Sequence, residues 1–179
     1  MTKIEDLLPD VLPEVPGCPD EIAERDLPLA AREFCRETFV WQQIVLEKDD
    51  LTHDDDEHEI ADPFDGDILA ITRVEIGGDP VKFDWPRRDL LKAEGVGDLV
   101  AWGALQPKLN ERYVPDLLAD YYIEALTDGA KFRLMRMMGV EWAQPEMAGV
   151  YQRAFQSHVA HARMEAARKH TSRPRRAKS

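Results

Sequence analysis

The positions of proline restrict this chain more than any other feature of its sequence. Proline has no backbone N–H and breaks a helix interior, yet it is common in the first turn of a helix. The prolines between residues 9 and 19 therefore exclude a long helix at that end of the chain. Pro115 and Pro145, each followed by an acidic residue, instead mark the starts of two helices.

Three helices are predicted from apolar residues that recur three and four positions apart. The first runs from Asp20, as N-cap, to about Leu46, and Pro28 marks either its true first turn or a kink. The second begins at Pro115 and ends at Gly139. The third runs from Pro145 to about residue 170, and the short connection before it predicts an antiparallel hairpin of the second and third helices.

Strand signals fill the middle of the chain, over residues 57–109. Asp67–Ile76 is rich in β-branched residues, Gly77-Gly78-Asp79 is a tight turn, and Val81–Phe83 alternates as a return strand. Leu99–Leu105 gives a further strand. A solvated acidic loop, 47–59, is predicted just before this region.

These elements predict a mainly α fold: a three-helix bundle, made of one long helix and an antiparallel helical hairpin. A small antiparallel β insertion, 57–109, lies between the first and second helices. Residues 1–170 are expected to form a single domain, and 171–179 an extended basic tail.

The net charge of −12 is unevenly distributed. From Arg163 onward there are seven basic residues and one acid, so this end carries +6 and residues 1–162 carry −18. An acidic body should repel nucleic acid, whereas the basic end suits an acidic partner or phosphates. No apolar run approaches the roughly 18–20 residues that span a bilayer, and Met1–Asp6 lacks the apolar stretch of a signal peptide, so a cytoplasmic protein is expected.

Candidate chemical sites are few. The strongest is His53-Asp54-Asp55-Asp56-Glu57-His58, but it lacks the ligand spacing of a calcium loop and is better explained as part of the acidic loop. His158 and His161 lie one helical turn apart with no further ligand in view, which favours surface or packing roles. The sequence therefore predicts no catalytic residue, no cofactor and no metal, and a protein that is not an enzyme.

The two cysteines and the basic end complete the candidates. Cys18 and Cys35 are predicted to be buried thiols rather than a disulfide or a reactive pair. The basic end is either a solubilising terminus or a peptide that docks on a partner, and nonspecific DNA contact stays open. Docking is favoured because arginine suits paired hydrogen bonds to carboxylates. The candidate docking residues are Arg173, Pro174, Arg175, Arg176 and Lys178.

Three groups of short motifs also belong together. The first is LLPDVLPEVPGCP at 7–19 with AREFC at 31–35 and VW at 40–41. The second is VPDL at 114–117 with EAL at 124–126 and GA at 129–130. The third is WAQP at 142–145, then Tyr151, Phe155 and TSRP at 171–174. Over residues 7–45 and 113–176 the chain resembles the head–tail connector, or adaptor, proteins of tailed bacteriophages.

This resemblance implies a structural virion protein. It implies a ring of twelve copies bound beneath the portal, with the C-terminal segment reaching into the portal protein. Its other implied partner is a downstream tail or neck protein, and genomic DNA passes through the channel without specific binding or any membrane contact. The expected location is the neck of the virion, and the host cytoplasm during assembly.

Several alternatives remain beside the adaptor. A tail-terminator or stopper ring is the nearest, and a nucleic-acid-binding module acting through the basic end is another. A metal-dependent hydrolase would use His53–His58. Within the adaptor hypothesis, the acidic surplus of residues 1–162 is expected to line part of the channel, because like charge keeps DNA from adhering to the wall.

Overall fold

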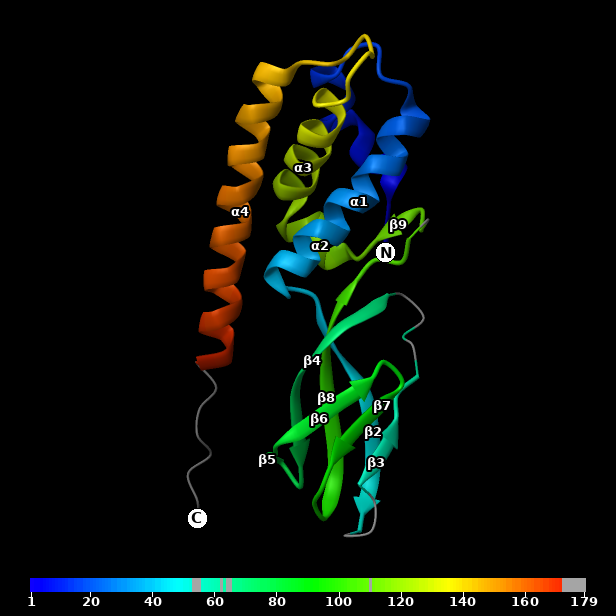
Figure 1. Ribbon diagram of the computed structural model, residues 1–179, viewed down its shortest axis with the longest axis vertical. Coiled ribbons are helices and arrows are strands. Elements are labelled where there is room, and N and C mark those ends of the chain that lie inside the picture. Colours follow the sequence, from blue (N-terminus) through cyan, green and yellow to red (C-terminus); the bar gives the residue numbers. More distant parts are fainter. Residues whose placement is uncertain (53–55, 62, 64–65, 110, 172–179) are drawn as a thin grey trace. The chain divides into compact units, whose positions relative to one another are not determined.

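The chain forms two compact units, a helical unit and a strand unit (Figure 1). The computed structural model describes residues 1–52, 56–61, 63, 66–109 and 111–171, and within this set 167–171 only as helix backbone. The helical unit comprises Met1–Val40 and Leu109–Ser179. The strand unit comprises Trp41–Lys108.

The helical unit contains all four α-helices of the described residues. Its first segment forms β1 (Thr2–Lys3) and the 3-10 helices η1 (Ile4–Asp10) and η2 (Leu12–Glu14), followed by α1 (Asp20–Thr38). Its second segment forms β9 (Tyr113–Val114), α2 (Asp116–Tyr121), α3 (Ile123–Met135) and α4 (Pro145–Thr171). Strands β1 and β9 pair in antiparallel fashion, and the Thr2 hydroxyl donates a 2.7 Å hydrogen bond to the Asp116 carboxylate. This pairing joins the start of the chain to the start of α2.

Phe34 of α1 is the centre of the helical core. Its ring is fully buried, and its centroid lies 5.1 Å from that of Tyr122 and 6.2 Å from that of Phe155 on α4. Gly129 of α3 lies against the same cluster, where a Cβ atom would come within 3.0 Å of Ala30 and of the Phe155 ring. The glycine therefore allows α3 to approach both α1 and α4 closely.

A polar network joins α1 to α3 beside this core. Asp26, only 3% exposed, accepts from Arg133 Nε at 3.3 Å and from Arg25 Nη2 at 3.0 Å. Arg133 also donates through Nη1 to Glu33 at 3.1 Å. A buried carboxylate needs such donors, because desolvation disfavours its charged form unless hydrogen bonds replace water.

Replacing Arg133 by methionine is expected to lower the free energy of unfolding by about 1.5–3 kcal/mol, because hydrogen bonds to charged groups contribute that much. The methionine keeps most of the packing and leaves the Asp26 carboxylate with the exposed Arg25. Chemical denaturation followed by circular dichroism measures the loss. In an Asp26→Asn background the same substitution should cost clearly less, and equal costs in both backgrounds would contradict the network.

The strand unit contains two antiparallel sheets. The four-stranded sheet has the order β2 (Gln42–Leu51), β8 (Gly97–Gln106), β4 (Asp67–Ile76), β5 (Asp79–Pro80). The three-stranded sheet has the order β3 (Glu57–Glu59), β7 (Leu90–Ala93), β6 (Phe83–Arg87). Both sheets contribute to one apolar core, which includes Ile71, Val74 and Leu99 from the first sheet and Leu91 and Ala93 from the second.

The predicted mainly α three-helix bundle is therefore wrong. The fold is mixed α/β, with 44% helix, 30% strand and three antiparallel sheets. The first helix ends at Thr38, where Phe39 takes a left-handed conformation with φ of 52°, and β2 begins at Gln42. The sequence predicts a helix as far as Leu46, because Thr38, Trp41 and Val45 also match helical spacing. Pairing of β2 with β8 makes this segment a strand rather than a helix, since β-branched residues fit a half-buried sheet.

Other predicted elements have different outcomes. Strand β4 has the predicted bounds, and α4 agrees within one residue at its end. The second helix is divided into α2 and α3 at Tyr122, and α3 ends at Met135, four residues before Gly139. The return strand after the Gly77-Gly78 turn is only Asp79–Pro80. Positive φ values of 59° and 85° at these two glycines explain why the turn itself was recognisable.

Candidate assembly surfaces

Helix α4 packs against the rest of the helical unit through one side. Ala148, Phe155, Val159 and Ala162 are at most 4% exposed, and they recur at helical spacing. Figure 1 shows α4 alongside α3, which follows from the short connection between them. Among the described helices, none is both long enough and apolar enough to cross a membrane.

Polar contacts fix the position of α4 along its neighbours. The Tyr122 hydroxyl donates to Glu165 at 3.2 Å, His158 Nε2 lies 3.3 Å from the Asp128 carboxylate, and Arg163 contacts Glu37 on α1. Burial, with the nearby Glu165 carboxylate, raises the pKa of Tyr122 to about 12, so the phenol stays protonated as a donor. The three contacts lie within residues 158–165 of α4, and they fix the helix against its neighbours.

Desolvation governs the Asp128 side chain in the same contact. Burial raises the pKa of Asp128 above its ordinary value, while Lys131 and His158 act in the opposite direction. Lys131 and His158 therefore partly offset the effect of burial on this carboxyl group. The predicted packing role of His158 agrees with its position between α3 and α4.

A second side of α4 carries apolar side chains that nothing in the described helical unit covers. Met147, Val150 and Met164 are 38%, 44% and 53% exposed. Together with Ala154 and His161 they recur at intervals of three, four and seven, which places them on one helix side. This set, Met147, Val150, Ala154, His161 and Met164, is called the outer stripe. It extends about 26 Å along the helix axis.

Helical spacing alone places Met147 and Ala154 in one apolar stripe with Phe155 and Ala162, although Met147 is exposed and Phe155 is 1% exposed. A helix with a wide apolar face gives no sequence signal for where its buried side ends. The exposed part is the part available for assembly.

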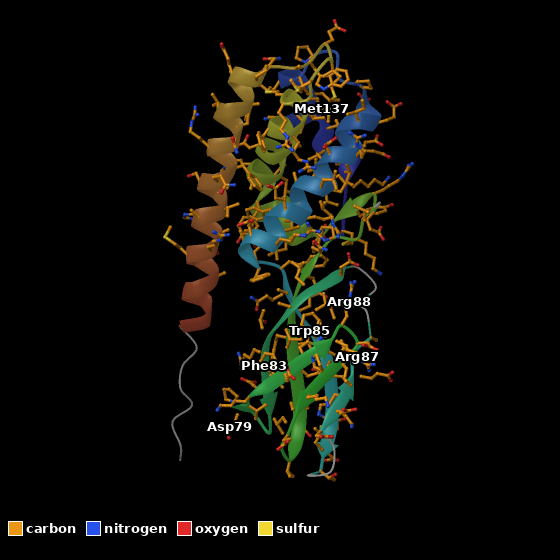
Figure 2. All side chains as sticks on the ribbon, viewed as in Figure 1. Asp79, Phe83, Trp85, Arg87, Arg88 and Met137 are labelled. Atoms are coloured by element: carbon orange, nitrogen blue, oxygen red, sulfur yellow. The ribbon has the colours of Figure 1, made fainter. Side chains whose placement is uncertain are left out.

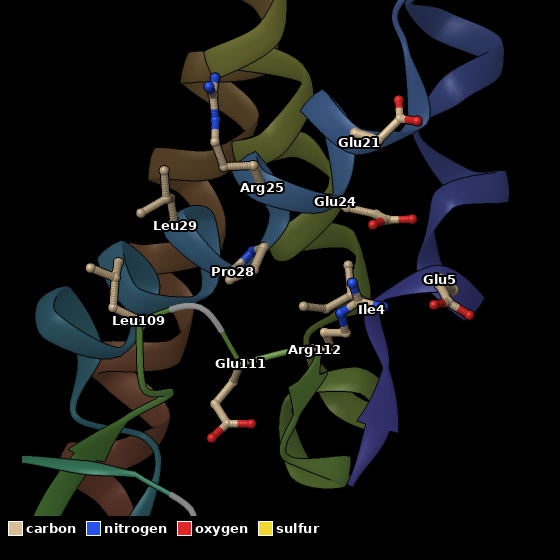
Figure 3. A pocket seen from close by; sticks show the side chains of 10 residues that line it. All are labelled: Ile4, Glu5, Glu21, Glu24, Arg25, Pro28, Leu29, Leu109, Glu111 and Arg112. Carbon is tan, nitrogen blue, oxygen red and sulfur yellow. The ribbon is translucent and has the colours of Figure 1, made fainter.

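A groove of about 390 Å³ lies elsewhere in the helical unit (Figure 3). Its walls come from α1, from the start of η1 and from the residues before β9. The apolar side chains are Ile4, Pro28, Leu29 and Leu109. The charged side chains are Glu5, Glu21, Glu24, Arg25, Glu111 and Arg112, which sum to −2. The groove therefore combines an apolar interior with an acidic rim.

The strand unit presents an aromatic and basic edge at β6 (Figure 2). Phe83 is 37% exposed, and Trp85 is half-buried with its indole N–H 3.3 Å from the Arg88 carbonyl oxygen. Arg87 and Arg88 follow after Pro86, and Arg88 is paired with Asp67 at 3.3 Å. Aromatic residues and arginine are enriched at protein interfaces, so this edge is a second candidate surface.

The docking residues predicted from the basic end all lie outside the described residues. They are Arg173, Pro174, Arg175, Arg176 and Lys178. Their role in binding a portal stays a prediction.

The acidic segment 47–59 is not the simple loop that its charge predicts. Strand β2 continues to Leu51, and β3 covers Glu57–Glu59, while His53 lies outside the described residues. His58 is 1% exposed, and its Nε2 lies 3.1 Å from the Ala93 carbonyl oxygen. Within the described part of the chain, no group of three or more His, Cys, Asp or Glu side chains is arranged to hold a metal ion.

Both cysteines are buried, as predicted. Burial raises the pKa of Cys35 to about 12, and burial together with nearby carboxylates raises that of Cys18. Because the thiolate is the reactive form, neither thiol should react readily in the folded protein. This property allows introduced cysteines to be used as selective probes.

Comparison with protein-family models and with curated protein sequences gives no match. Neither the groove nor the outer stripe was predicted from the sequence. The groove joins residues more than 100 positions apart, and no local pattern predicts that. Met147, Val150 and Met164 do lie at helical spacing, but that spacing alone does not show that they are exposed.

Proposed function

We propose that this chain is a head-to-tail adaptor of a tailed bacteriophage, a structural protein that forms a ring of twelve copies beneath the portal. The ring joins the DNA-filled capsid to the downstream tail or neck protein. The proposal extends the resemblance carried by residues 7–45 and 113–176. The structural observation that best supports it is the uncovered outer stripe of α4.

An uncovered apolar helix side favours assembly for a physical reason. Exposed apolar area is unfavourable in water, and contiguous apolar patches on a soluble protein commonly mark interaction sites. The outer stripe lies on a helix whose position is fixed by the buried Phe155 and by the Tyr122–Glu165 hydrogen bond. It is a rigid element suited to a permanent subunit contact.

Charge supports the position of such a ring on the path of DNA. Residues 1–162 carry −18, and like charge prevents a phosphate polymer from adhering to a channel wall. We place part of this acidic surplus on the channel surface. A basic channel with all carboxylates on the outer rim would contradict this assignment.

The proposed anchor to the portal is the basic end of the chain. Replacing Arg173, Arg175, Arg176 and Lys178 by serine should weaken attachment to portal-bearing heads by about 100-fold or more, because a ring presents many tails at once and multivalency multiplies weak contacts. Co-sedimentation of the purified variant with heads of the same phage measures this. Folding should be unchanged, since the polar contacts that fix α4 end at Glu165.

The matched control changes Ser172 and Ser179 to alanine in the same segment and should bind heads like the parent. Retention of the serine variant at parental levels would show that this segment is not the anchor. A parent protein that binds only tail components would identify a terminator or stopper ring. Salt-sensitive binding of DNA by the isolated parent would favour a nucleic-acid-binding module instead.

A further inference from the structure

The outer stripe and the groove are complementary in chemistry. The stripe presents exposed apolar side chains, of which Met147 and Val150 lie at its N-terminal end. The groove presents an apolar interior of matching character, with Ile4 and Pro28 buried among its lining. Apolar surfaces associate because both lose contact with water.

Charge complementarity selects one end of the stripe. Arg153 is exposed one turn beyond Val150 and forms no ion pair among the described residues. The groove rim carries Glu21 and Glu24 on α1 together with two further glutamates, Glu5 and Glu111. An arginine held beside these carboxylates gains charge-assisted hydrogen bonds.

We infer that the N-terminal half of α4 in one copy docks in the groove of a second copy, with Met147 and Val150 against its apolar interior and Arg153 against its glutamates. The inference rests on the proposed ring and names its subunit contact. The groove lining contains no residue of α3 or α4, so one copy can donate its helix and accept another at the same time. Such a head-to-tail contact closes into a ring when its rotation permits.

Disulfide trapping tests the contact directly. One preparation carries Val150→Cys and the other Leu29→Cys, and the two are mixed under mild oxidation. We expect a mixed disulfide dimer at least tenfold more abundant than the dimer from either preparation alone. The native cysteines are buried and give little background.

The matched control replaces Val150→Cys with Gln152→Cys, which is exposed on the same helix. Residues one or two positions apart do not face the same way on a helix, so Gln152 points away from Val150. It should give no more mixed dimer than the single preparations. Rings that form without the 150–29 disulfide would overturn the docking contact and leave the proposed ring intact. Absence of self-association in sedimentation at every concentration would overturn both.

A charge exchange provides an independent measurement. Arg153→Glu should raise the concentration needed for assembly about tenfold, within the range measured for close interfacial charge pairs. Adding Glu24→Arg to the same chain should restore most of the loss. Circular dichroism should show unchanged folding for both variants, because Arg153 is exposed. An assembly concentration that both substitutions leave unchanged would contradict the placement of Arg153 against the groove glutamates.

Discussion

Replacing Phe34 by alanine is expected to lower the free energy of unfolding of the helical unit by about 3–5 kcal/mol. The ring is fully buried between Tyr122 and Phe155, and it joins α1 to the start of α3 and to α4. Its removal loses the transfer of a large apolar side chain from water and leaves a cavity that rigid helices fill poorly. Far-ultraviolet circular dichroism during chemical denaturation follows this unit, because all the described α-helices belong to it.

Tyr121→Ala is the matched control for this prediction. It removes an aromatic ring from the same unit at a position that is 76% exposed, so its effect should stay within about 0.5 kcal/mol. A similar loss for both variants would mean that the aromatic cluster around Phe34 is not the core of the helical unit. A small loss for Phe34→Ala would lead to the same conclusion.

The second large effect is expected in the strand unit. Leu91 of β7 is fully buried, and it lies in the apolar core that both sheets share. Leu91→Ala should lower the free energy of unfolding by about 2–5 kcal/mol. Tryptophan fluorescence is the suitable probe, because three of the four tryptophans, Trp41, Trp85 and Trp102, belong to this unit.

Val96→Ala is the comparison for Leu91→Ala, since Val96 is 57% exposed in the same unit. Its expected effect is within about 0.5 kcal/mol. Equal and small effects of the two substitutions would contradict a core shared by the sheets. The strand unit would then depend on contacts other than those of β7.

Local chemistry made several elements predictable from sequence. Pro145 begins α4 because its ring favours the first helical turn, and the outcome agrees within one residue at the far end. Strand β4 was predictable because it is rich in β-branched residues up to the Gly77-Gly78 turn. In both cases the decisive residues lie within the element or directly beside it.

The rest of the fold depends on partners distant in sequence. Gln42–Leu51 has apolar residues that fit helix or strand, and its pairing with Gly97–Gln106 decides the outcome. Strand β7 is only four residues long, and it is defined by pairing with both β3 and β6. Such short or ambiguous segments carry too little local preference to be assigned before the tertiary structure is known. For this reason the chain was predicted to be mainly α.

The candidate surfaces also differ in whether local sequence or tertiary structure determines them. The basic end could be recognised from charge alone, since charge is a property of composition. The groove could not, because Ile4, Glu24 and Arg112 come together only after the chain has folded. Exposure was also invisible in sequence, as Tyr121 shows: its aromatic ring predicts helix packing, yet it is 76% exposed.

The insertion of the strand unit between two parts of the helical unit has a consequence for the order of folding during synthesis. The strands that pair within Trp41–Lys108 are complete once residue 106 has emerged from the ribosome. Helix α1 is made earlier, but its partner Phe155 emerges more than 100 residues later. Domains generally fold as units during translation. The apolar side of α1 therefore stays without its partner on the nascent chain while the strand unit, which is synthesised after α1, folds first. Ribosome-bound chaperones are suited to preventing its aggregation during this interval.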